Sequence, residues 1–228
     1  MKKHSDMTSD QNPLFPLIRH LSRRVTPLLL MTPVSANGVS ILSLAGGLAA
    51  AWLLMVGSYE ATLQAAAILI ISYVLDNCDG EVARANGQVS KFGEALDDFI
   101  DWVVHAALFS GLGYGHAEAT GERFWFWLGV AAAIGATINY FIGQYMTYRD
   151  RMQPELNVED DVEDGSLPTT PLLWVIYFLR ELSRADFCFL VAVLAALNSL
   201  WLLLPAGAIG AQVYWMTQFV QGARKFHV

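Results

Sequence analysis

Four aspartates, and the spacing between them, are the most informative feature of this chain of 228 residues. Asp76 and Asp79 are three residues apart, and Asp97 and Asp101 are four residues apart. Residues at these separations share one face of a helix, so each pair presents its carboxylates together. If the two faces turn toward each other, their oxygens form a site for a metal ion.

The residue types around this site indicate the chemistry. Carboxylate oxygens without histidine or thiolate favour Mg²⁺ or Mn²⁺ over Zn²⁺. Two such ions about 3.5–4 Å apart can clamp a diphosphate and stabilise a departing oxygen. Gly80 and Gly93 allow a phosphate or nucleotide to approach the backbone closely, and Arg84 can neutralise a phosphate by bidentate hydrogen bonding. We therefore expect a diphosphate substrate, with catalysis by positioning and charge stabilisation.

The elements that must position these residues are apolar helices. Hydrophobic residues make up 54% of the chain and charged residues 15%, which is typical of an integral membrane protein. Because a span needs about 20 apolar residues, the hydropathy predicts an all-α fold of six transmembrane helices. They are expected at residues 37–57, 61–83, 92–115, 123–147, 185–203 and 205–223. The aspartates lie where the second and third of these spans meet.

The remaining segments complete a single membrane domain, residues 13–228, after a polar tail at 1–12. Residues 13–31 mix apolar side chains with arginines, which predicts an amphipathic juxtamembrane helix on the membrane surface; a solvated linker is the alternative. A second interfacial helix is expected at 171–182. Six of the 21 acidic residues lie at 155–164, within a loop near 149–170 that we interpret as solvated, a metal or partner site being the alternative.

The distribution of basic residues predicts the orientation of the chain. They precede the first span, join the second to the third and the fourth to the fifth, and end the chain, whereas the opposite loops contain Arg123 alone. The positive-inside rule then places both termini and the aspartates on the cytoplasmic side. The basic residues are scattered and lack interleaved aromatics, so we expect no nucleic-acid partner.

The motif that contains the aspartates resembles a known signature. Asp76-x2-Asp79-Gly80-x2-Ala83-Arg84-x8-Gly93-x3-Asp97-x3-Asp101 is similar, at every fixed position and spacing, to that of the CDP-alcohol phosphotransferase (CDP-alcohol phosphatidyltransferase) family, prokaryotic type. The six-span layout and the preceding amphipathic helix extend the resemblance to most of the chain. The segment from Pro33 to Ser40 also resembles the family's entry into its first span.

The resemblance implies an enzyme of phospholipid biosynthesis. A second alcohol attacks the β-phosphorus of a CDP-alcohol, such as CDP-diacylglycerol or CDP-inositol, so that CMP leaves and a phosphodiester forms. At least one of the two alcohols is a lipid, the protein is a homodimer, and the membrane is a prokaryotic inner (plasma) membrane. The cofactors it implies are Mg²⁺ or Mn²⁺, as two ions.

It also implies a role for each residue of the motif. Asp76, Asp79 and Asp97 are metal ligands, and Asp101 is the general base that takes the acceptor's proton and can also contact the second metal. The residues that line the CDP site are Asp76, Asp79, Gly80, Ala83, Arg84 and Gly93.

Neighbouring residues have two interpretations each. Asp98 is about 100° round the helix from Asp97 and should miss the metal site. His105 either orients Asp101 or is a hydrogen-bonded core histidine, which we favour. Asn37 and Ser40 are candidates for nucleotide contacts, although helix capping explains them equally well. Candidates for binding an acceptor phosphate, which the positive-inside bias alone could also explain, are Arg149, Arg151, Arg180 and Arg184.

Two other classes of protein also place aspartates in a membrane. A membrane prenyltransferase uses an isoprenoid diphosphate, but its two acidic motifs lie far apart, whereas here they fall within residues 76–101. An ion channel or transporter would use the aspartates as pathway residues. That alternative leaves the spacing of the glycines and the arginine unexplained.

Overall fold

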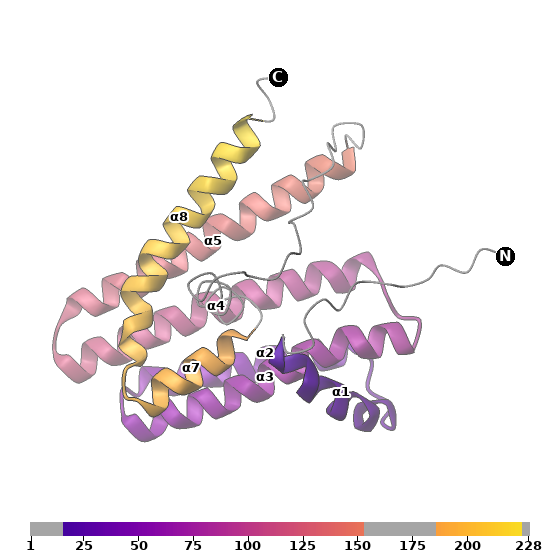
Figure 1. Cartoon of the computed structure of the whole chain (residues 1–228), viewed down its shortest axis with the longest axis horizontal. Coiled ribbons are helices and arrows are strands. Elements are labelled where there is room, and N and C mark those ends of the chain that lie inside the picture. Colours follow the sequence, from indigo (N-terminus) through magenta and orange to yellow (C-terminus); the bar gives the residue numbers. More distant parts are fainter. Residues whose placement is uncertain (1–15, 153–185, 225–228) are drawn as a thin grey trace, which may run out of the picture.

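The computed structural model of the chain describes residues 16–152 and 186–224, and within them all the regular structure is helical (Figure 1). The elements are α1 (Leu17–Leu30), α2 (Ala36–Met55), α3 (Tyr59–Ala85), α4 (Lys91–Thr120), α5 (Arg123–Met152), α7 (Phe187–Ala196), the 3-10 turn η2 (Leu200–Leu202) and α8 (Leu203–Arg224). The all-α fold class is therefore confirmed for the described part of the chain.

Serine caps set where three of the long helices begin. The side chains of Ser35, Ser58 and Ser90 each accept a hydrogen bond from the backbone N–H three residues later, at the starts of α2, α3 and α4. These bonds satisfy donors that have no partner within the helix. Gly121 ends α4 in the left-handed conformation, with φ at 76°, which glycine adopts without steric cost. Short turns consequently join α2 through α5.

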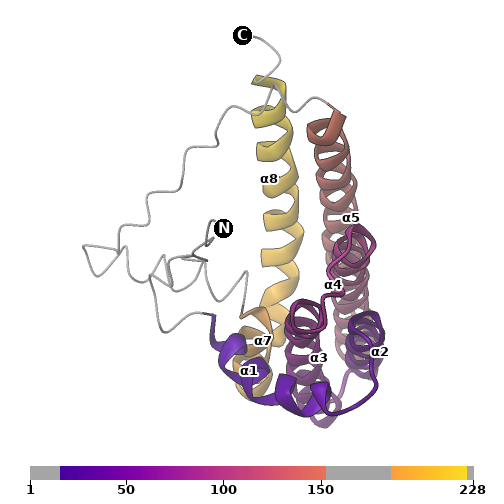
Figure 2. The same ribbon diagram turned by 90° about the vertical axis from the view of Figure 1, so that its right-hand side faces the viewer.

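The helices form a bundle with one extended pair. α2 packs against α3 and α4, and α4 packs against α5. α5 and α8 run side by side and project beyond the other helices (Figures 1 and 2). α1 crosses α3 at one end of the bundle, and the short α7 also packs on α3.

Glycines allow α4 to approach its neighbours closely. A Cβ added to Gly113 would meet the Cα of Gly129 on α5 at 2.9 Å, and one added to Gly111 would collide with the Ala51 carbonyl of α2. Small residues at such crossings let backbones pack closely, a common device in membrane helix bundles. α4 is thereby held between α2 and α5, which fixes the helix that carries Asp97.

The amphipathic helix expected at 13–31 is present as α1. Its buried residues are Ile18, Ser22 and Thr26, which repeat every four positions and face α3, while Arg19 and Arg24 are exposed. The face packed on the bundle is therefore partly polar.

The predicted spans agree with the first four long helices, α2 to α5, to within a few residues, except that α4 and α5 extend further at their carboxyl ends. Among the described residues, the helices long and apolar enough to cross a membrane are Ala36–Met55, Tyr59–Ala85 and Arg123–Arg149. α4 has 30 residues, but its first turns carry Lys91, Glu94 and the aspartates.

The prediction of one continuous span at 185–203 was wrong. α7 has 10 residues and ends at Ala196; Asn198 then takes a positive φ of 52°, and η2 leads into α8. A left-handed residue cannot continue an α-helix, so the apolar run is broken there. The loop at 155–164 and the second interfacial helix expected at 171–182 lie outside the described residues.

Candidate metal and nucleotide site

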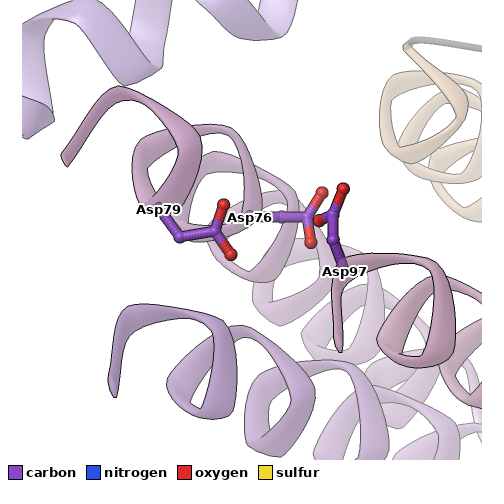
Figure 3. Close-up of side chains that lie close together, drawn as sticks. All are labelled: Asp76, Asp79 and Asp97. Carbon is purple, nitrogen blue, oxygen red and sulfur yellow. The ribbon is translucent and has the colours of Figure 1, made fainter. Parts of the chain in front are cut away.

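Three of the four aspartates converge at the junction of α3 and α4. One carboxylate oxygen from each of Asp76, Asp79 and Asp97 lies within 4.8 Å of the other two. In Figure 3 the carboxylates of Asp76 and Asp97 face each other across the two helices, with Asp79 beside them. Asp79 is buried, Asp76 is half-buried and Asp97 is exposed, so the cluster opens toward one side.

A short, anchored turn brings the two helices together. Gly87 in this turn has a φ of 65°, and Ser90 then caps α4 through the N–H of Gly93. Gln88 fastens the turn to α2, because its side-chain oxygen accepts a hydrogen bond of 3.1 Å from the N–H of Ala36. The start of α2 therefore lies against the turn that positions Asp97 relative to Asp76.

The first turns of α2 contribute two of the predicted side chains. The buried hydroxyl of Ser40 donates a hydrogen bond of 2.5 Å to Asp79 Oδ2. The side-chain oxygen of Asn37 lies 3.8 Å from where a Cβ on Gly93 would be, so Asn37 faces the backbone of α4. The interpretation of these two residues as helix caps was wrong, because Ser35 is the cap. Ser40 instead orients a carboxylate of the cluster.

Gly80 and Arg84 form the neighbouring surface of α3. A Cβ on Gly80 would lie 3.3 Å from a guanidinium nitrogen of Arg84, so the arginine folds back over the glycine. Arg84 is exposed and Ala83 is half-buried. This surface offers the bidentate hydrogen-bond donors of Arg84 a little more than one helical turn beyond Asp79.

Asp101 lies one turn along α4 from Asp97, is exposed, and is not among the three residues that converge. His105 bonds to the backbone of Asp101 rather than to its carboxylate: His105 Nδ1 is 2.7 Å from the Asp101 carbonyl oxygen. Its Nε2 is 3.1 Å from the hydroxyl of Tyr73. Because a carbonyl can only accept, Nδ1 carries a proton, and in the neutral imidazole Nε2 then accepts from the hydroxyl of Tyr73. These contacts support the core-histidine interpretation.

Asp98 points away from the cluster, as its position on the helix predicts. Its Oδ2 accepts a hydrogen bond of 3.0 Å from the side-chain amide of Gln144 on α5. Asp98 thus joins two helices.

The cluster fits a hard divalent cation. All three converging groups offer oxygen, the spread of their ligand atoms is small, and the exposed side at Asp97 leaves room for phosphate oxygens or water. A single ion would also offset the repulsion among three carboxylates, which are costly together at a membrane boundary.

Of the four candidates for binding an acceptor phosphate, the structure describes two. Arg149 lies half-buried near the end of α5, and Arg151 follows in the same helix. Arg180 and Arg184 lie outside the described residues.

Several residues near the site were not singled out from the sequence. Glu81 accepts hydrogen bonds from Ser22 and Thr26 of α1, and Asp186 accepts two from the start of α1. The i,i+4 spacing of Ser22 and Thr26 on an amphipathic helix could have indicated a polar contact, but their partner is 55 residues or more away.

Comparisons with known proteins agree with the motif. The model of the CDP-alcohol phosphatidyltransferase family matches residues 33–179, which include all four aspartates. The chain is 30% identical over 124 residues to the bifunctional IPC transferase and DIPP synthase of Thermococcus kodakarensis, covering 53% of this chain and 27% of that protein. It is 36% identical over 106 residues to the archaetidylinositol phosphate synthase of Pyrococcus horikoshii, covering 45% of this chain and 49% of that protein. The chain thus matches about half, or less, of the length of these curated relatives.

A solved structure shares the fold. The phosphatidylinositol phosphate synthase of Mycobacterium tuberculosis, solved with CDP-DAG bound, superposes with a TM-score of 0.53 at 20% identity, covering 87% of this chain and 93% of that one. This likeness covers most of the chain and supports an integral membrane protein with helical spans.

Proposed function

Because the chain belongs to the CDP-alcohol phosphatidyltransferase family, we propose that it transfers a substituted phosphate group from a CDP-alcohol to an acceptor alcohol in phospholipid synthesis. The observation that carries this proposal is the convergence of Asp76, Asp79 and Asp97 beside Gly80 and Arg84. That arrangement places carboxylate oxygens that can bind a metal ion next to hydrogen-bond donors that can bind a phosphate. A site for a nucleoside diphosphate requires both.

In the proposed reaction the acceptor's hydroxyl oxygen forms a bond to the β-phosphorus of the donor. The bond from that phosphorus to the bridging oxygen breaks, and CMP leaves with the electron pair. Asp101 takes the hydroxyl proton, because this exposed residue lies one turn from Asp97 on the same face of α4. A phosphodiester is the product.

We assign the remaining roles by position. Asp76, Asp79 and Asp97 would hold Mg²⁺ or Mn²⁺, and two bound ions would neutralise the diphosphate and stabilise the departing oxygen. Gly80, Ala83 and Arg84 would line the CDP site from α3, and Gly93 and Asn37 would line it from α4 and α2. Ser40 holds Asp79 in place. The candidates for the acceptor phosphate are Arg149, Arg151, Arg180 and Arg184.

The substrates we favour are inositol-containing. The named relatives include synthases of archaetidylinositol phosphate and phosphatidylinositol phosphate, and the latter was solved with CDP-DAG bound. We therefore propose a CDP-linked lipid with inositol phosphate as the acceptor; CDP-inositol with a lipid acceptor is the other pairing. Family membership disfavours the prenyltransferase and transporter alternatives.

We further propose that α2, α3, α4, α5 and α8 each cross the membrane and that α7 together with η2 makes the remaining crossing, which leaves both termini and the aspartates on the cytoplasmic side. α1 would lie at the cytoplasmic surface of a prokaryotic inner membrane, where its exposed Arg19 and Arg24 would meet lipid headgroups. The family resemblance supports a homodimer.

A substrate panel tests the proposal. Purified chain with Mg²⁺ would be incubated with CDP-diacylglycerol, its archaeal ether analogue or CDP-inositol, each with and without candidate acceptors, and the products identified by mass spectrometry. We expect one donor and acceptor pair to yield CMP and phosphodiester in equal amounts. Flux of ions through reconstituted vesicles without any such product would contradict the proposal.

A further inference from the structure

Glu81 lies inside the aspartate motif but faces away from the aspartates. Successive helix residues are about 100° apart, so Glu81 is turned by about 200° from Asp79. Its two carboxylate oxygens are both used: Oε1 accepts a hydrogen bond of 2.7 Å from the hydroxyl of Ser22, and Oε2 accepts one of 2.5 Å from the hydroxyl of Thr26. Glu81 therefore binds α1 and not the metal site.

Both hydroxyls are enclosed by the contact between α1 and α3. Ser22 is 0% exposed and Thr26 is 7% exposed. Burying a carboxylate against a helix is unfavourable unless it is hydrogen-bonded, and two hydroxyl donors meet that need. Directional hydrogen bonds of this kind fix the position of α1 along α3, whereas a purely apolar contact between the two helices would not.

A second carboxylate fixes the other end of α1. Asp186, which is 0% exposed and directly precedes α7, accepts hydrogen bonds of 2.8 Å from the N–H of Leu17 and 2.9 Å from the N–H of Ile18. α1 is consequently fastened to α7 at its start and to α3 at its middle. These contacts at two places hold α1 against the last turns of α3.

The same turns of α3 are held from the opposite side by α2. Ser40 of α2 bonds to Asp79, and Gly80 and Arg84 lie between that bond and the contact with α1. The segment from Asp79 to Arg84 is thus clamped on two faces. We therefore expect a shift of α1 to change the position of Arg84 relative to Asp97 on α4.

We propose that Ser22, Thr26 and Glu81 form a positioning clamp for the CDP-alcohol donor. The clamp would contact neither substrate nor metal and would act by fixing the positions of Gly80 and Arg84. This proposal rests on the CDP-binding function proposed above for these two residues. Loss of the clamp should weaken donor binding, whereas the acceptor should bind as before.

The test compares hydroxyl deletions at the clamp with a matched control. Ser22→Ala combined with Thr26→Val removes both donors, and Thr26→Ser keeps its hydroxyl. Thr62→Val makes the same change at the other end of α3, where the hydroxyl donates to the Ser58 carbonyl of its own helix. The measurements are kcat, KM for donor and acceptor separately, binding of CDP to the purified full chain in Mg²⁺, and Tm.

We expect the double variant to raise the donor KM and the dissociation constant of CDP by about 3-fold to 30-fold, because the lost hydrogen bonds act on donor binding only through the placement of Gly80 and Arg84 and therefore by less than their full contribution to stability. Its acceptor KM should stay within about twofold of the wild type, which is within the scatter of a neutral substitution. Thr26→Ser and Thr62→Val should match the wild type in every binding measurement. If the double variant does not fold, the single Thr26→Val variant, which keeps the Ser22 bond, carries the same comparison.

The proposal fails if Tm falls while the donor KM and CDP binding stay unchanged, because the clamp would then only hold the fold together. It also fails if Thr26→Ser behaves like Thr26→Val, or if donor and acceptor KM rise equally. A wild-type chain that neither binds CDP nor releases CMP would instead overturn the proposed function, and with it the clamp.

Discussion

The Ser40 hydroxyl donates a hydrogen bond to the Asp79 carboxylate across 39 residues of sequence, from α2 to α3. Asp79 is the buried member of the aspartate cluster, and Ser40 is buried with it. The residue nearest the protein interior is therefore held in a fixed orientation, while Asp97 remains open to the exterior.

Replacing Ser40 by alanine should weaken metal binding. Residues that orient a metal ligand typically contribute about 10-fold to 100-fold to affinity or activity, so we expect the Mg²⁺ concentration for half-maximal activity to rise within that range. The measurement is a metal titration of turnover at saturating donor. Ser43→Ala is the control, since Ser43 lies on the same helix and donates to the carbonyl of Ser40. An unchanged titration curve for Ser40→Ala would show that Asp79 needs no such support.

Replacing Asp101 by asparagine should reduce turnover while leaving the donor KM nearly unchanged. General-base catalysis typically contributes about 10²-fold to 10⁴-fold, and asparagine keeps the shape of the side chain without accepting the proton. Single-turnover release of CMP measures this step. Asp98→Asn, which alters a carboxylate bonded to Gln144, serves as the control. Full turnover of Asp101→Asn would refute the assignment of the base.

Replacing Tyr73 by phenylalanine tests whether His105 takes part in catalysis. The change removes the donor to His105 Nε2 and leaves the bond to the Asp101 carbonyl. We expect the free energy of unfolding to fall by about 0.5–1.5 kcal/mol, the usual net value of one hydrogen bond, and kcat to stay close to that of the wild type. Tyr59→Phe is the control, because its exposed hydroxyl bonds to the Ala196 carbonyl. A large loss of kcat at unchanged Tm would instead place His105 in the path of the proton.

Replacing Gly113 by alanine should destabilise the bundle. The added methyl would lie 2.9 Å from the Cα of Gly129 and 3.0 Å from the Trp125 carbonyl oxygen, so α4 and α5 would have to separate. Overpacking of this kind typically costs about 1–3 kcal/mol, which thermal unfolding in detergent would detect. Gly143→Ala is the matched control, since a methyl there meets nothing within 4 Å. Equal Tm values for the two variants would contradict the close packing of α4 on α5.

The sequence predicted the parts of the fold that depend on local composition. Long apolar runs predicted α2, α3, α4 and α5. The mixture of apolar and basic residues at 13–31 predicted α1. The break after α7 escaped prediction because Asn198 and Ser199 are a short polar interruption in an otherwise apolar run, and one left-handed residue leaves no mark on hydropathy.

The convergence of three carboxylates could be predicted from the sequence, whereas the contacts that hold these side chains in place could not. The spacing of Asp76, Asp79 and Asp97 placed them together because helix geometry and a short turn determine where they lie. The partners of Glu81 and Asp186 depend on contacts between helices distant in sequence, and no local pattern encodes these contacts.

The central claim is that the aspartate cluster supports transfer of a phosphate group from a CDP-alcohol to an acceptor. The most direct measurement is CMP release by the purified chain with Mg²⁺ and CDP-diacylglycerol, with and without inositol phosphate, for the wild type and for Asp76→Asn. We predict that the wild type releases CMP only with the acceptor present and in equal amount to the phosphodiester formed. Chelation of the metal should abolish CMP release by the wild type. The Asp76→Asn variant should also release no CMP, although it folds correctly. Full activity of Asp76→Asn, or release of CMP without any acceptor, would contradict the claim.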